Sequence, residues 1–413
     1  MRKIPTRRSV SMTADRKNII SAVIASVLAL SLFKGVHDRQ IKHSTGKSHI
    51  TVGFIYDGDD STPYTANYIQ AVQQLDEVYG SRVTVIERKN VPYESSGDVI
   101  NELAASGCEL IFTNSYGYGE TAKKMAEEYP DIEFCAATCD NSDDEPQLDN
   151  YHTCMGEIYQ GRYLSGMVAG LKMKEMISDG TISPDQAQVG YVAAYPNAEV
   201  ISGYTAFILG VRSQCPEAVM RVRYINSWTN FSLEHKTAEK LINEGCVMIS
   251  HHSNTIGSAI ACEEANKPYP IYHIGYNQNM MNVAPTAELT GTRIDWTPYI
   301  TGAVGAVLKD EDIEDAVDGH IFGQDASGGL KEGWVKLIGI NTAAAAEGTE
   351  KLIKKATEDF SDGRIRVFFG NYTGKDPDDP TDTTDLRQEY KENEYSSTPT
   401  FHYVLDDIII IEE

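Results

Sequence analysis

Short apolar runs alternate with amphipathic helical segments along most of this chain. The clearest stretch spans residues 222–279, where the end of VMRVRYI (219–225), then CVMISHH and IYHIGY, are strand-like runs separated by the helical patterns LEHKTAEKLINEG and IGSAIACEEANK. This alternation is typical of an α/β protein whose strands pair in parallel. It therefore restricts the chain to a small set of doubly wound folds.

The alternation begins at Ile50, which suggests a first lobe. ITVGFIYD, RVTVIE, CELIFTN and IEFCAAT predict strands, and TANYIQAVQQLDEVYG, SGDVINELAASG and TAKKMAEEYP predict the helices between them. A continuous apolar run indicates a strand that is buried on both faces of a parallel sheet. We therefore expect lobe 1 at residues 49–165.

A second series of the same kind follows the long helical pattern YQGRYLSGMVAGLKMKEM, and it begins with QVGYVAAYP. We expect lobe 2 at residues 166–295, with residues 296–330 returning to lobe 1 and 331–370 to lobe 2. RIRVFFG (364–370) is a candidate for the last core strand, and residues 371–413 are expected to form an acidic, loop-rich tail. Two such lobes leave a cleft between them, in which hinge motion can enclose a ligand.

Polar and aromatic residues follow the strands of the second series. In an open α/β sheet, ligands bind beyond the carboxyl ends of the strands. The residues at these positions combine one aromatic ring with uncharged hydrogen-bonding groups: Trp228, Asn230, Ser253, Asn254 and Asn277. They include no nucleophile with its base, and the chain has no GxSxG motif, so the pattern favours binding over catalysis.

The charge and the cysteines exclude several classes of function. The formal net charge is −24, the wrong sign for binding a nucleic-acid backbone. The seven cysteines are too scattered for a disulfide framework, and Cys135 and Cys139 lack a second pair at zinc-like spacing. The adjacent His251 and His252 lack the spacing of a helical ligand pair. We therefore expect no metal and no cofactor.

The first 48 residues predict an export signal. MRKIPTRRSVSMTADRK is basic, and the short apolar run NIISAVIASVLALSLF follows it. A cleaved signal peptide and an uncleaved anchor helix both remain open. The first cysteine is Cys108, so a lipid anchor directly after this run is excluded. We expect an exported protein on the extracytoplasmic face of the bacterial plasma membrane, anchored or periplasmic.

Several strings together resemble the basic membrane protein family of substrate-binding proteins, in the branch related to bacterial purine-nucleoside receptor lipoproteins. They include ELIFTNSYGYGETAKKMAEEYPDIEF, GEIYQGRYLSGMVAG, INSWTNFSLEHKTAEKLINEG, HIGYNQNM, RIDWTPY and GGLKEGWVKL. The resemblance covers roughly residues 50–362. It implies a type I periplasmic-binding-protein fold and the capture of a purine nucleoside or nucleobase for the permease of an ABC importer, by a monomer.

The resemblance also implies ligand contacts at positions that match the family's loops. In lobe 1 these are Tyr64, Thr65, Asn67, Asn114, Ser115 and Tyr116. In lobe 2 and the returning strand they are Trp228, Ser253, Asn254, Asn277 and Asp295.

Two departures from the family bear on the ligand. Asn277 stands where many members have an aspartate that binds ribose hydroxyls, so charge-assisted bonding to a ribose is weakened, and a free nucleobase or another small planar or polar metabolite remains open as the ligand. The lysine that nucleoside receptors have near Asp295 has no counterpart in TRIDWTPY.

A membrane-anchored sensor for a similar solute is the alternative function.

Overall fold

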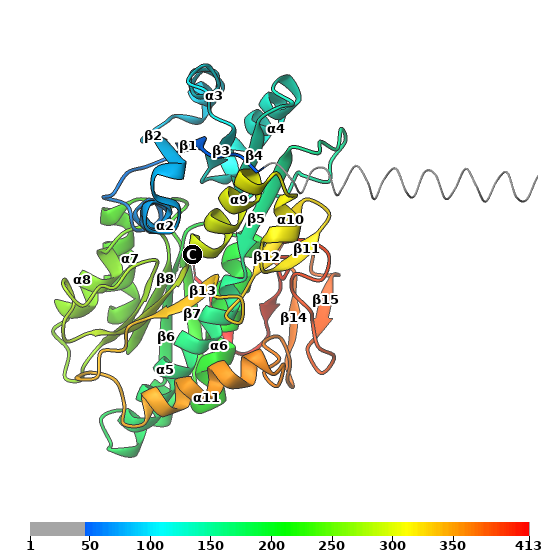
Figure 1. Ribbon diagram of the computed structural model, residues 1–413. Helices are drawn as coiled ribbons and strands as arrows, with labels where there is room; N and C mark the ends of the chain where they lie inside the picture. Colours follow the sequence, from blue (N-terminus) through cyan, green and yellow to red (C-terminus); the bar gives the residue numbers. More distant parts are fainter. Residues whose placement is uncertain (1–45, 413) are drawn as a thin grey trace, which may run out of the picture.

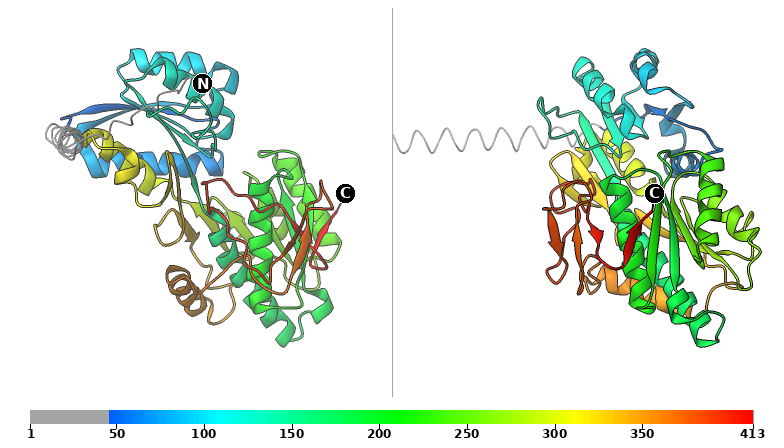
Figure 2. Two further views of the ribbon diagram at one scale, coloured as in Figure 1. Left: turned by 90° about the vertical axis from the view of Figure 1, so that its right-hand side faces the viewer. Right: turned by 180° about the vertical axis from the view of Figure 1, so that it is seen from behind.

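The structure is a computed structural model that describes residues 46–412, so the predicted N-terminal signal or anchor lies outside the described residues apart from residues 46–48. Two α/β lobes lie one above the other in the left view of Figure 2. Each contains a sheet of seven strands, which confirms the two doubly wound lobes. Among the described residues, no helix is both long enough and apolar enough to cross a membrane.

Lobe 1 is built on a sheet that is parallel except at one edge (Figure 1). Its strands, in spatial order, are β11 (His320–Phe322), β12 (Asp325–Gly328), β5 (Tyr151–Gly156), β4 (Glu133–Ala137), β3 (Leu110–Thr113), β1 (Ile50–Ile55) and β2 (Val83–Arg88). Its helices are α2 (Pro63–Tyr79), α3 (Ser96–Ala105), α4 (Gly119–Glu128), α9 (Thr297–Lys309) and α10 (Ile313–Ala316).

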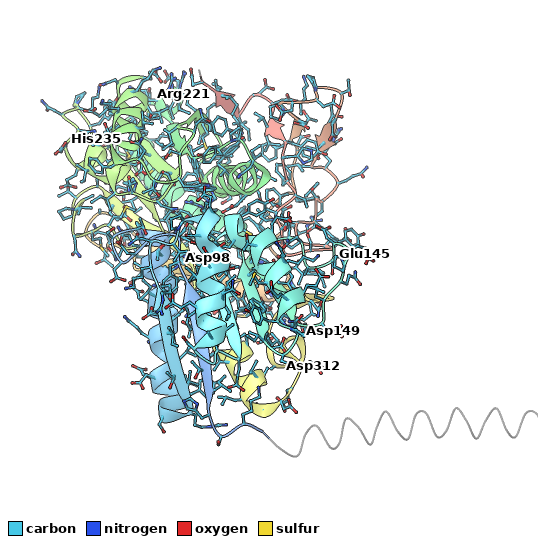
Figure 3. All side chains as sticks on the ribbon, turned by 90° about the horizontal axis from the view of Figure 1, so that it is seen from above. Asp98, Glu145, Asp149, Arg221, His235 and Asp312 are labelled. Carbon is cyan, nitrogen blue, oxygen red and sulfur yellow. The ribbon has the colours of Figure 1, made fainter. Side chains whose placement is uncertain are left out.

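Lobe 2 repeats this plan with a second sheet. Its strands, in spatial order, are β13 (Val335–Ile338), β10 (Glu288–Ile294), β9 (Tyr272–Tyr276), β8 (Met248–His252), β6 (Gln188–Ala193), β7 (Val219–Tyr224) and β17 (Ile409–Ile411). Its helices are α5 (Ile158–Ser178), α6 (Ala198–Gln214), α7 (Phe231–Asn243), α8 (Gly257–Glu263) and α11 (Thr349–Ser361). The labelled Arg221 and His235 lie on this lobe, and Asp98 and Asp312 lie on lobe 1 (Figure 3).

The chain passes between the lobes at the β5–α5, β10–α9 and β12–β13 connections. Because α9 packs with the lobe 1 core, the segment after β10 returns to the first sheet. The connections set the two sheets so that the loops after their parallel strands form the interlobe region.

Helices α5 and α6 pack with their backbones in close contact. A methyl group at Gly166 would lie 2.2 Å from the carbonyl oxygen of Phe207, and one at Gly210 would lie 2.1 Å from that of Tyr163. Glycine at these two positions is therefore required by the packing rather than by the backbone conformation. The first turns of α5 also contact the end of the second sheet, because Arg162 Nη2 donates to the His251 carbonyl oxygen of β8.

The tail adds structure to lobe 2. A three-stranded sheet contains β14 (Thr373–Lys375), β15 (Thr383–Asp385) and β16 (Val404–Leu405), and β17 pairs in parallel with β7. The candidate strand at residues 364–370 was wrong, because these residues form no strand. Phe368 instead stacks on Phe401 of the tail with ring centroids 4.4 Å apart, which takes the segment away from the sheet.

Candidate ligand-binding site between the lobes

On lobe 1, the site is organised around Asp57, which lies two residues after the end of β1 and is exposed. Its backbone N–H donates to Asn114 Oδ1 at 3.0 Å, and its Oδ1 accepts from Asn114 Nδ2 at 3.2 Å. The hydroxyl of Thr65 also donates to Asp57 Oδ1, at 3.2 Å. Asn114 and Thr65 thus hold the carboxylate by Oδ1, and the Tyr93 hydroxyl also lies beside this carboxylate at the carboxyl end of the sheet.

Tyr64 lies in the first turn of α2, where it approaches residues of both lobes. Its hydroxyl donates to the Asn114 carbonyl oxygen, and its ring lies 6.4 Å from that of Trp296. Burial raises the pKa of Tyr64 well above its ordinary value, and the nearby Asp57 and Glu199 raise it further. Since Glu199 belongs to α6 of lobe 2, Tyr64 lies near acidic groups of both lobes.

On lobe 2, an aromatic cluster follows the strands of the sheet. The Trp228 ring lies 5.8 Å from the Tyr195 ring and 6.1 Å from the His252 ring. Tyr276 in turn lies 4.6 Å from His252. Trp228 and Tyr195 are only partly buried, so their rings can contact a ligand.

Two asparagines lie beside this cluster. The Asn254 backbone N–H donates to the Trp228 carbonyl oxygen at 2.7 Å, and Asn277 Nδ2 donates to Asn254 Oδ1 at 3.2 Å. Asn277 is held at φ 65°, a left-handed conformation that asparagine tolerates. Its buried Oδ1 has no hydrogen-bond partner among the described residues. This oxygen is therefore a ready acceptor for an N–H or O–H group of a ligand.

The base of the site carries a buried positive charge. The Arg162 guanidinium lies 4.1 Å from the centroid of the Tyr276 ring, and its Nη2 donates to the His251 carbonyl oxygen at 2.8 Å. Burial and then the charge of Arg162 lower the pKa of His252 to about 4. His252 is therefore neutral near pH 7, and its Nε2 lies 3.5 Å from Glu199 Oε1.

Three of the predicted contacts turn their polar atoms into the protein. Asn67 Nδ2 donates to the Ile294 carbonyl oxygen, and the Ser253 hydroxyl donates to the buried Glu234 at 2.7 Å. Asp295 accepts from the Thr297 backbone N–H at 3.0 Å and pairs with Lys336. Burial opposes ionisation of Asp295, but the bonds from Lys336 and Thr297 outweigh it and lower its pKa.

The remaining predicted residues lie at the edge of the site. The Ser115 hydroxyl is 3.0 Å from the Tyr93 hydroxyl, and Tyr116 is 67% exposed. Asn230 caps α7, because its Oδ1 accepts from the Leu233 backbone N–H at 3.0 Å. The structure thus brings together Tyr64, Thr65 and Asn114 on one lobe, and Trp228, Asn254 and Asn277 on the other.

Sequence reasoning did not single out five residues that the structure places here: Asp57, Arg162, Tyr195, Glu199 and Lys336. Asp57 and Tyr195 had a usable signal in the sequence, because each lies at the end of a predicted strand segment. Arg162 and Glu199 lie in helices, and only the packing of α5 and α6 brings them to the sheet. Lys336 supplies a lysine beside Asp295 that TRIDWTPY lacks, because β13 pairs with β10.

The arrangement suits a flat, polar ligand. Aromatic rings offer stacking surfaces, and the asparagines offer both donors and acceptors. Asp57 and Glu199 offer charged acceptors for N–H or O–H groups.

Comparisons with known proteins identify relatives of this chain. The family model described as Bmp, ABC transporter substrate-binding protein PnrA-like, matches residues 49–364. A purine-binding protein of Brucella abortus is 28% identical over 351 residues, which cover 84% of this chain and 89% of the relative. A candidate ABC transporter glucose-binding protein of Haloferax volcanii is 31% identical over 230 residues, covering 56% of this chain and 54% of the relative.

Solved structures share the fold. A solute-binding protein of an ABC transporter system from Conexibacter woesei superposes with a TM-score of 0.57 at 17% identity, covering 77% of this chain and 98% of its own. A second solute-binding protein of an ABC transporter system, from Aeropyrum pernix, superposes with a TM-score of 0.59 at 16% identity, and the match covers 76% of this chain and 92% of its own. Both are solute-binding proteins, which supports a type I periplasmic-binding-protein fold.

Proposed function

Because this chain belongs to the Bmp family of ABC transporter substrate-binding proteins, we propose that it captures a purine nucleoside or nucleobase between its lobes and delivers it to the permease of an ABC importer. The family and the structural neighbours are solute-binding proteins, so the chain is a binding protein rather than an enzyme in this proposal. Export to the extracytoplasmic face, through the basic and apolar N-terminal segment, is part of the proposal, and so is a monomeric state.

One observation carries the choice of ligand: a partly exposed indole beside a pair of amide groups on the same sheet edge. Trp228 accepts from the backbone of Asn254, whose side chain accepts in turn from Asn277. A purine ring needs a stacking surface next to groups that donate and accept in its plane. The similarity to the Brucella abortus purine-binding protein points to the same class of ligand.

Asp57 provides the matching acceptor on lobe 1. Its carboxylate is exposed, and Asn114 and Thr65 hold it by Oδ1. A purine or a ribose that fills the space between the lobes would donate an N–H or O–H group to this carboxylate. Leaving such groups unpaired costs about 1–3 kcal/mol each, which would reject ligands that lack the donors.

Calorimetric titration of the full chain tests the proposal. The protein is unfolded and refolded to remove any carried ligand, then titrated with adenosine, guanosine, inosine, the corresponding free bases and D-glucose. We expect micromolar or tighter binding of at least one purine, weakened by Trp228→Ala. Binding of glucose alone, or of none of these compounds, would contradict the purine assignment. Chromatography of the protein incubated with a nucleoside detects any free base that is released. Release of free base would contradict a function in binding alone.

A further inference from the structure

The C-terminal tail contains a group of side chains that the interlobe site does not use. The loop between β14 and β15 spans residues 376–382 and contains four aspartates, and the segment that enters β16 contains His402. The pairing of β14 with both β15 and β16 brings this loop beside that segment. This part of the chain lies beyond residues 49–364, which the family model matches. The group is therefore independent of the proposed transport function.

Three atoms of this group converge on one point. His402 Nε2 lies 3.2 Å from Asp382 Oδ2 and 3.9 Å from Asp376 Oδ2, and the three ligand atoms all lie within 4.8 Å of one another. Ligands at about 2.1 Å from a zinc ion are about 3.4 Å apart in a tetrahedral site. The three atoms thus already have nearly the spacing that an ion at their centre would require.

The other polar atom of each of these side chains is held by a hydrogen bond. Asp376 Oδ1 accepts from the Asp378 backbone N–H at 2.9 Å, and Asp382 Oδ1 accepts from the Tyr403 hydroxyl at 3.1 Å. His402 Nδ1 is 2.7 Å from the Thr400 carbonyl oxygen, which can only accept. Nδ1 therefore carries the proton, and the Nε2 lone pair can bind a cation. Outer bonds of this kind orient the ligands of protein metal sites.

From these contacts we propose that Asp376, Asp382 and His402 form a binding site for one first-row divalent metal ion, of which zinc is the best match. One imidazole and two carboxylates suit zinc and its neighbours better than calcium or magnesium, which prefer oxygen ligands alone. The side chains are 21%, 43% and 35% exposed, in the order Asp376, Asp382 and His402, so water can complete the coordination. The spacing in the sequence gave no sign of this site, because its ligands come from two separate segments.

The bound ion would fasten the hairpin loop to the strand that follows Phe401. Phe401 is fully buried and packs on Phe368 and Tyr390, so its position sets how the tail covers lobe 2. The ion therefore has a structural role in this proposal: it stabilises the tail against lobe 2.

Zinc titration of the full chain tests the site. The protein is treated with EDTA, dialysed and titrated with ZnCl2 by calorimetry, and thermal unfolding is followed with and without zinc. We expect the wild type to bind one more zinc ion than the His402→Gln and Asp382→Asn variants bind. If the variants bind the same number of ions, the wild type should bind one of them at least about tenfold more tightly than the variants do. Zinc should raise the unfolding temperature of the wild type more than that of either variant.

His235 provides a matched control. Its ring lies 3.4 Å from Glu239 of the same helix, α7, and 3.5 Å from Glu264 at the end of α8, far from the three-stranded sheet (Figures 1 and 3). His235→Gln should therefore bind zinc like the wild type. The proposal is overturned if either tail variant, folded by circular dichroism, retains wild-type zinc binding, or if no zinc binds up to millimolar concentration. In that case His402 forms only an ion pair with the two aspartates.

Discussion

The guanidinium of Arg162 lies over the ring of Tyr276, 4.1 Å from its centroid. Arg162 belongs to the first turns of α5, directly after the chain leaves lobe 1, and Tyr276 ends the strand β9. The contact therefore joins the β5–α5 connection to the base of the interlobe site. The charge of Arg162 also lowers the pKa of the neighbouring His252, after burial as the larger cause.

Replacing Arg162 with methionine should raise the pKa of His252. Burial is the largest cause of its low pKa of about 4, and the charge of Arg162 is the next. Without that charge the pKa should move up toward the ordinary value of about 6.5, without reaching it. NMR titration of the histidine ring protons measures the shift, and His152 in lobe 1 is the internal control. An unchanged His252 titration would show that Arg162 does not set its charge.

Removing the indole of Trp228 should weaken binding of the preferred purine by about tenfold or more, because stacking is lost together with buried apolar area. Tyr395→Ala is the matched control, since Tyr395 is 81% exposed on the tail and should not affect affinity. Calorimetry with both variants measures the difference. Equal affinities of the two variants would place the ligand away from Trp228.

Asn277→Asp should shift the preference from nucleobase toward nucleoside. A carboxylate at this buried position would bind ribose hydroxyls through charge-assisted hydrogen bonds, which are roughly twice as strong as neutral ones. The ratio of nucleoside to base affinity should rise about fivefold. Asn279→Asp, at an exposed position two residues further on, should leave the ratio as it is in the wild type. A ratio that does not respond to Asn277→Asp would separate this residue from ribose recognition.

His152 should make the stability of lobe 1 depend on pH. Its ring nitrogens lie 2.6 Å from Glu314 Oε1 and 3.1 Å from Glu133 Oε2. Burial opposes the charge, but these two carboxylates outweigh it and raise the pKa of His152 to about 9. Because the pKa is raised on folding, the stabilisation is complete below about pH 6.5 and is lost as the pH rises through about 9.

The protonated His152 contributes at most about 3 kcal/mol to the free energy of unfolding, because Glu133 is partly exposed and solvent screens its charge. Urea unfolding of the wild type and of His152→Gln at several pH values measures this term. The two proteins should differ most near pH 6 and converge above pH 9. A difference that does not change with pH would mean that the imidazole acts through packing alone.

Much of the fold could be predicted because most strands are apolar runs. The runs beginning at Ile50 and Val219 correspond to β1 and β7. The strand β5 was missed, since its buried His152 and Thr153 interrupt the apolar pattern. Their burial is possible only because partners elsewhere in the chain bind them, such as Glu314 and Asp325. A local pattern holds no information on such partners.

The candidate site, like the fold, could be predicted only where a local sequence pattern points to it. Trp228 and Asn277 were predicted because they follow strands, and the topology of α/β sheets places such residues at the ligand edge. Glu199 and Arg162 reach the site through the contact between α5 and α6, whose glycines allow the close approach. That contact joins segments that lie far apart in the sequence, and no spacing rule predicts it.

The pairing of β17 with β7 has a consequence for biosynthesis. The ribosome makes β7 long before β17, so one border of the lobe 2 sheet has unpaired backbone groups while the rest of the chain emerges. An open border of this kind can pair with another nascent chain. The lobe 2 sheet is therefore complete only after β17 has been translated.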